Sequence, residues 1–163
     1  MNRVELLLKG WDFSYGEEDW YPPLKHALNG LTAAQADWRP EGFQVNSIWQ
    51  NVNHLIFYKE RLLKRWTGEE TEYPSGVTND DTFAVPSTEE SDWQETVARL
   101  ERVQQGIRGK LAALSETELE TAIPSRKLED WAHSLIRHDA YHTGEIIQLR
   151  KMQGSWPARR SFE

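Results

Sequence analysis

The chain has 163 residues, a formal net charge of −7 and no cysteine. This length suits one domain around a single core, so we predict one domain over residues 1–163. Without cysteine, disulfides and cysteine-ligated metals are excluded, and a metal site would need His, Asp or Glu. The acidic balance and the lack of a Lys/Arg cluster argue against nucleic-acid binding.

The sequence has neither a run of about 20 apolar residues nor a basic and then apolar leader. We therefore expect a cytoplasmic protein that does not span a membrane. Runs of alternating apolar and polar residues, which indicate strands, are also lacking. The sequence predicts helices throughout.

The N-terminal region is predicted to be helical in two parts, over residues 2–9 and about 17–30. Pro22 and Pro23 are tolerable only near the first turn of the second part, because proline lacks a backbone N–H. Gly30 is the predicted stop of this helix.

Capping patterns mark the next two elements. Thr32 can cap a short turn over residues 33–36. Ser47 and Gln50 match a capping box that begins a long helix ending near Trp66. Residues 67–87 then predict a loop of about 20 residues, a length that is usually functional or mobile.

Two more long helices follow. The third is predicted from Ser87 or Thr88 to about Leu114, and the fourth from just after Ser125 to about Met152. Four long helices joined by short or moderate connections predict an all-α fold, a four-helix bundle.

The fourth helix carries two histidines, His138 and His142, four residues apart. This spacing puts both rings on one helical face, close enough to reach one metal ion. Burying an imidazole without a partner costs several kcal/mol, so the pair needs hydrogen-bond acceptors or a metal. Both lie on the predicted inward stripe, which runs through Leu128, Trp131, Leu135, His138, His142, Glu145 and Leu149.

A third histidine would complete a ligand set. His54 lies on the second long helix, on a polar strip about 100° from the centre of the apolar stripe. Its phase leaves open whether it lines a pocket or marks the boundary of the core. His26 suits a surface or helix-end position and His133 is out of phase with the stripe, so neither is assigned to the site.

The segments Ser47–Leu55 and His138–Ile146 together resemble the DinB/YfiT-like superfamily of small bacterial four-helix proteins. The resemblance spans about residues 18–152. It depends on a second-helix His combined with a fourth-helix His-x-x-x-His-x-Gly pattern. One position departs from the family, since Glu145 stands where glutamine commonly follows the glycine.

The resemblance implies a divalent metal ion, zinc or nickel, bound by His54, His138 and His142. It also implies a homodimer and, for some members, transfer or isomerisation with a bacillithiol-type low-molecular-weight thiol. Three neutral imidazoles would leave a coordination position open for water or a thiolate.

Three further residues are candidate catalytic helpers. Each lies about one turn from a histidine of the site, and each also has the plainer role of packing or hydrogen bonding beside a ligand. They are Glu145, Tyr58 and Asn51.

The predicted function is a metal-dependent enzyme acting on a small-molecule substrate. The resemblance alone favours thiol-dependent transfer over hydrolysis, since the residues do not separate the two. The alternative is a non-catalytic metal-binding or stress-response protein, in which the site is structural or sequesters a ligand. A fourth protein ligand such as Glu145 would favour the structural alternative. The candidate aromatic residues for a dimer interface are Trp11, Trp20 and Trp156.

Overall fold

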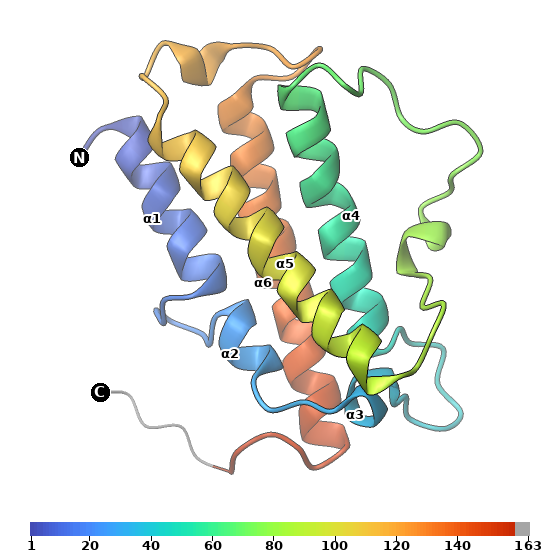
Figure 1. Cartoon of the computed structure of the whole chain (residues 1–163). Helices are drawn as coiled ribbons and strands as arrows, with labels where there is room; N and C mark the ends of the chain where they lie inside the picture. The colour runs from blue at the N-terminus through green and yellow to red at the C-terminus, as the bar shows by residue number, and fades with distance from the viewer. Residues whose placement is uncertain (159–163) are drawn as a thin grey trace.

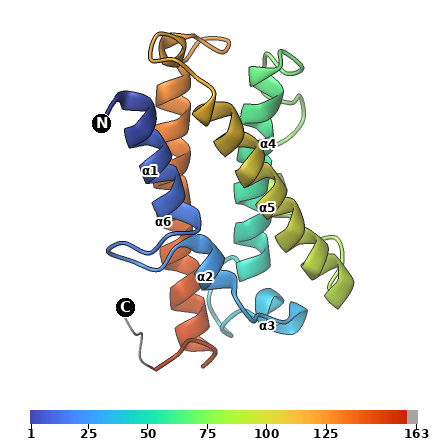
Figure 2. The same ribbon diagram turned by 60° about the vertical axis from the view of Figure 1, so that its left-hand side comes forward.

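The computed structural model describes residues 1–158, so residues 159–163 of the predicted domain lie outside the described part. Within residues 1–158 every named element is a helix, which confirms the all-α prediction. The four long helices form a bundle, and two short helices lie together at one end of it (Figures 1 and 2). The long helices are α1 (Arg3–Tyr15), α4 (Ile48–Trp66), α5 (Glu90–Ala112) and α6 (Leu128–Met152). The short helices are α2 (Leu24–Leu28) and α3 (Ala33–Asp37), and two 3-10 turns, η1 (Asp80–Phe83) and η2 (Glu118–Glu120), lie in the connections.

Each long helix has two neighbours in the bundle. The helix α6 packs against α1 on one side and α4 on the other, and α5 contacts the same two helices (Figure 2). One face of α6 can therefore take partners from both α1 and α4. No helix within residues 1–158 is long and apolar enough to cross a membrane.

The capping box that begins α4 is present as predicted. The Ser47 hydroxyl accepts from the Gln50 amide at 3.2 Å, and the Gln50 side chain accepts from the Ser47 amide at 2.8 Å. These bonds satisfy two N–H groups that a helix start leaves without partners. They fix the residue at which α4 begins. The start of the helix in turn sets the direction in which the side chains one and two turns later point.

The N-terminal region differs from the prediction. The helix α1 continues to Tyr15, and the next helix starts only at Leu24. A residue that precedes proline is disfavoured in the helical region, so Tyr21 and Pro22 do not continue a helix, and α2 begins only after Pro23. The prediction of helix over 17–23 was wrong for that reason.

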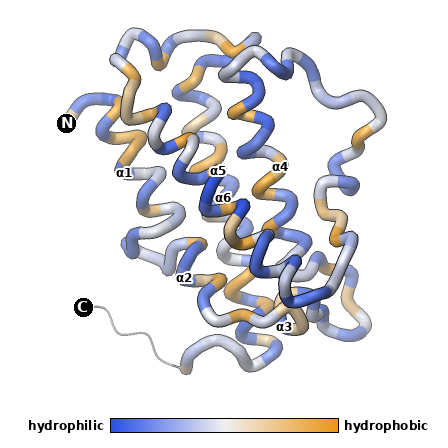
Figure 3. Tube along the Cα trace, viewed as in Figure 1, coloured by the Kyte–Doolittle hydropathy of each residue, from blue (hydrophilic) through white to orange (hydrophobic). Residues whose placement is uncertain are grey.

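Tryptophans fill the core. Trp11, Trp49 and Trp93 are buried, and the rings of Trp49 and Trp93 meet edge to face with centroids 5.4 Å apart. Trp11 is therefore excluded as an interface residue, whereas Trp20 is 91% exposed. Along the long helices apolar and polar residues alternate in bands, as expected where one face is buried (Figure 3).

A buried ion pair joins α4 to α6. Lys59 and Asp139 are both fully buried, and the Lys59 ammonium contacts the Asp139 carboxylate directly. The ammonium also lies 5.2 Å from the ring centroid of Trp11, and the Ser14 hydroxyl lies 3.3 Å from the second carboxylate oxygen. Burial lowers the pKa of Lys59 and raises that of Asp139, while the attraction between the two opposes both shifts. The pair connects three of the four bundle helices.

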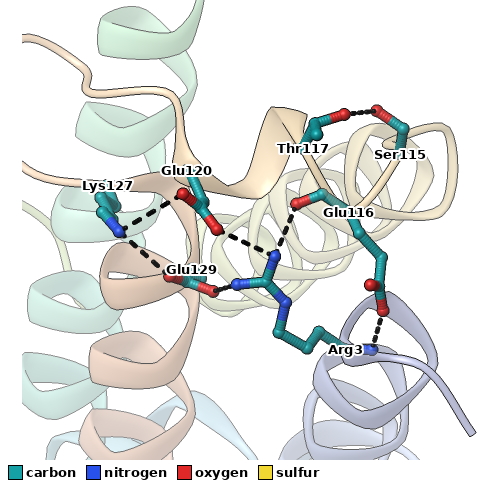
Figure 4. A network of polar contacts seen from close by, with 7 residues as sticks. All are labelled: Arg3, Ser115, Glu116, Thr117, Glu120, Lys127 and Glu129. Atoms are coloured by element: carbon teal, nitrogen blue, oxygen red, sulfur yellow. Dashed lines mark hydrogen bonds and ion pairs between the residues drawn. The ribbon is translucent and has the colours of Figure 1, made fainter.

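A second polar network ties the start of α1 to the connection between α5 and α6 (Figure 4). The Arg3 guanidinium donates to Glu120 and to Glu129, each at 3.1 Å, and also to the Glu116 carbonyl oxygen. The Arg3 side chain is exposed, so each contact contributes little to stability. The network instead holds the start of α1 against the connection between α5 and α6.

Removing one member of the buried pair should destabilise the metal-free protein strongly. We expect Lys59→Met to lower the free energy of unfolding by about 3–5 kcal/mol, because it leaves the Asp139 carboxylate buried without its cation. The double variant Lys59→Met/Asp139→Leu should recover most of that loss, since an apolar pair needs no partner. Urea unfolding measures both. Equal stability of Lys59→Met and the unsubstituted chain would contradict the ion pair.

Candidate metal centre

Three histidine rings from two helices converge in the bundle. His54 comes from α4, and His138 and His142 come from successive turns of α6. The Nε2 atom of His138 lies 3.0 Å from Nε2 of His54 and 3.0 Å from Nε2 of His142. One ring nitrogen from each residue lies within 4.8 Å of the others. The structure thus brings together the three histidines that the sequence resemblance selected.

The partner of His54 determines where its proton lies. Its Nδ1 atom lies 2.6 Å from the Thr82 hydroxyl oxygen, and that hydroxyl donates its hydrogen to the Asn79 carbonyl at 2.6 Å. The hydroxyl must therefore accept from His54, which places the proton on Nδ1. The Nε2 atom of His54 is left with a free lone pair directed at the other two rings.

His142 is held in the same tautomer. Its Nδ1 atom lies 2.7 Å from Asn51 Oδ1 and 2.7 Å from Glu145 Oε2. The Asn51 amide nitrogen donates to the Ser47 carbonyl at 2.9 Å, so the amide oxygen is the atom that faces His142. A carboxylate and an amide oxygen only accept, which requires a proton on Nδ1 and a lone pair on Nε2.

These tautomers suit a cation at the centre of the three rings. The lone pairs of His54 and His142 both face Nε2 of His138, which can carry at most one hydrogen and so can satisfy only one of them. A divalent ion accepts all three lone pairs at once. Neutral imidazole nitrogens suit zinc, copper, iron and nickel, so the donor set fits the predicted zinc or nickel.

Burial keeps the rings neutral. It lowers the pKa of His54 to about 4 and that of His138 to about 3, with the neighbouring histidines adding to both shifts. Burial also lowers the pKa of His142, although the Glu145 carboxylate opposes that change. The unprotonated state that a metal ion requires is therefore already present at neutral pH.

A cavity of about 320 Å³ opens onto two of the three rings. Its wall includes His54, His138, Tyr58 and Trp131. The Tyr58 ring meets His54 and His138 edge to face, with centroids 5.0 and 5.6 Å away, and its hydroxyl donates to Asn79 Oδ1 at 2.9 Å. Burial raises the pKa of Tyr58 to about 12, so its phenol remains a proton donor rather than a base.

The connection between α4 and α5 explains the position of His54. This segment returns along α4, on the right in Figure 1, and places η1 against that helix. The Phe83 ring stacks on His54 at 4.0 Å between centroids, and Thr82 holds its Nδ1 atom. His54 is consequently only 5% exposed. Helical phase could not predict this burial, because the residues that cover His54 belong to a segment outside the helix. In the sequence, the only indication that this segment has a role was its length.

The buried face of α6 is rotated slightly from the predicted stripe. Ala132, Asp139 and Ile146 are fully buried at its centre, whereas Trp131 and Glu145 lie at its edge. The three candidate helpers all lie beside the histidines, Asn51 and Glu145 at His142 and Tyr58 at the cavity. His26 and His133 are exposed and lie outside the site, as predicted.

Compared with known protein families, residues 23–146 match the family model described as the DinB superfamily. This match covers more than half of the chain and includes all three histidines of the site. Comparisons with curated proteins and with solved structures give no significant match.

The low pKa values predict a pH dependence of stability in the metal-free chain. Between pH 6.5 and about 4 the unfolded chain binds protons on His54 and His138 and the folded chain does not. The stabilising effect of the neutral rings is thus complete above pH 6.5 and decreases as pH falls toward 4. Urea unfolding at several pH values should show this fall, and His138→Gln should reduce its slope.

The matched control for that experiment is His133→Gln, which removes an exposed histidine from the same helix. Its slope should equal that of the unsubstituted chain. An unchanged slope in His138→Gln would show that the ring of His138 titrates normally in the folded protein.

Proposed function

Because the chain belongs to the DinB superfamily, we propose that it is a metal-dependent enzyme whose ion is bound by His54, His138 and His142. A small thiol from solution then reacts at the open side of this centre. The observation that carries it is the convergence of Nε2 atoms beside a cavity that reaches two of the three rings.

Three protein ligands leave at least one position for an exogenous group, as in catalytic zinc sites. A bound divalent ion lowers the pKa of a coordinated thiol or water and so supplies a nucleophile near neutral pH. The chain itself has no cysteine, so the thiol must come from solution.

The residues around the site have separate roles in this proposal. Thr82 and Asn51 fix the tautomers of His54 and His142 and hold the rings in place. Glu145 accepts the same His142 proton as Asn51 and strengthens the basicity of its Nε2. The Tyr58 phenol lies at the cavity wall and donates its hydrogen to Asn79, so its oxygen can accept a hydrogen bond from a bound substrate.

The position of Glu145 favours a catalytic over a purely structural site. Its carboxylate lies behind the His142 ring, at Nδ1, and so does not close the side where the three Nε2 atoms meet. Within residues 1–158 the group able to hold a metal consists of the three histidines alone. The homodimer stays a prediction, for which Trp20 is the most exposed aromatic candidate.

Removing a ligand should remove the metal. We expect His54→Ala, His138→Ala and His142→Ala each to lose most bound zinc or nickel in elemental analysis and to lower the melting temperature of the loaded protein. His26→Ala and His133→Ala are matched controls on exposed histidines and should retain one equivalent. Full metal content in any of the first three would exclude that residue as a ligand.

The hydrogen bond from His54 Nδ1 to the Thr82 hydroxyl should increase the affinity of the site for zinc. Thr82→Val preserves the shape of the side chain but removes the acceptor of the His54 Nδ1 proton, and we expect it to weaken zinc binding by about 10–100-fold. Thr71→Val, in an exposed part of the same connection, is the control and should bind normally. A competition titration with a chelating dye measures both. Equal affinities would contradict the proposed role of Thr82.

The thiol step can be tested with cobalt in place of zinc. Adding a low-molecular-weight thiol to the cobalt-loaded chain should produce a sulfur-to-cobalt charge-transfer band in the near ultraviolet. Since the chain has no cysteine, the added thiol is the only source of such a band. A spectrum that does not change at millimolar thiol would contradict thiol activation while leaving the metal site intact.

A further inference from the structure

A second and larger cavity lies on the other side of His142. It measures about 620 Å³, which is within the range of small-ligand pockets. The segment that connects α3 to α4 forms one wall and the C-terminal half of α6 forms the other. Asn51 and Glu145, the two residues that accept from His142 Nδ1, both line it. None of the three histidines does.

Large apolar side chains remain exposed around this cavity. Phe43 is 66% exposed, Met152 47% and Val45 39%, and all three line it. Leaving such side chains in water is unfavourable, and when they gather at one concave place they mark a binding site. The cavity is therefore suited to a ligand with an apolar body.

The polar groups of the cavity select the head group of that ligand. Glu145 is the only lining residue with a charged side chain, and the other polar lining side chains are amides. Its side chain is 41% exposed; its Oε2 atom lies against His142, and the carboxylate also accepts from the Tyr141 hydroxyl, and both of these partners are uncharged in the folded protein. A carboxylate without a nearby lining cation attracts a positively charged donor and repels an anion.

We propose that this cavity binds an organic ammonium ion with an apolar body, whose ammonium group donates to the Glu145 carboxylate while its carbon chain packs on Phe43, Val45 and Met152. The site is distinct from the cavity at His54 and His138 and does not require a metal ion. Glu145 would contact both the ligand and His142, so the two sites share one side chain.

The test uses hexylammonium as the probe and the complete chain, both metal-free and zinc-loaded, with binding measured by calorimetry and amide NMR shifts. We expect hexylammonium to bind in both forms and to shift amide signals of residues 43–46 and 144–152. Hexanoate, with the same body and the opposite charge, should bind at least about tenfold more weakly. Methylammonium, which lacks the body, should also bind weakly.

Two variants test separately how the charge and the apolar contact contribute to binding, and a third serves as the control. Glu145→Gln should weaken hexylammonium binding about tenfold, because it removes the charge from the hydrogen-bond acceptor. Asp130→Asn removes an exposed carboxylate from the same helix outside the cavity and should bind normally. Phe43→Ser should weaken hexylammonium through lost apolar contact; it changes an exposed residue, so the chain should fold. Melting curves check the folding of each variant.

Three results would overturn the proposal. One is hexanoate binding as tightly as hexylammonium, and another is unchanged affinity in Glu145→Gln. The third is that sedimentation shows the chain to self-associate, Phe43→Ser dissociates it and the probe fails to bind. In that case a second copy of the chain occupies the cavity. Because binding is measured without metal as well, failure here is separate from failure of the metal site.

Discussion

The face of α6 that packs into the bundle carries three ionisable side chains within little more than one turn, namely His138, Asp139 and His142. An ionisable group in such a place costs several kcal/mol unless a partner satisfies it. The helix α6 therefore requires particular residues on its neighbours. Its position beside both α1 and α4 is what allows those residues to reach it.

The three side chains fall into two groups according to what satisfies them. Asp139 is satisfied by Lys59 of α4 and lies near Ser14 of α1, which makes it part of the bundle's own structure. The histidines are only partly satisfied from within the protein, because the Nδ1 atoms of His54 and His142 have acceptors while the Nε2 atoms of these two residues both face Nε2 of His138. The structural pair and the proposed metal centre thus lie side by side on one helix. The ion pair also restricts how α4 and α6 can slide, and so preserves the distance between His54 and the other two rings.

Much of this arrangement could be predicted from the sequence, and the rest has identifiable causes. The helices α4, α5 and α6, the capping box at Ser47 and the shared face of His138 and His142 depend on local spacing, which the sequence contains directly. The burial of His54 depends on Thr82 and Phe83, which reach it only after the connection folds back. The ion pair was missed although a local signal existed. Apolar residues of α4 recur at helical spacing at positions 48, 52, 55, 62 and 66, and Lys59 occupies the position on the same face between residues 55 and 62.

The most direct test of the account is nitrogen NMR of the five histidine rings during a zinc titration of the metal-free protein. The account predicts that His54 and His142 begin with their protons on Nδ1. It also predicts that the Nε2 signals of these two residues and of His138 shift together and saturate at one equivalent of zinc, while His26 and His133 do not change. Shifts at His26 or His133, or a titration without saturation at one equivalent, would contradict a three-histidine metal centre.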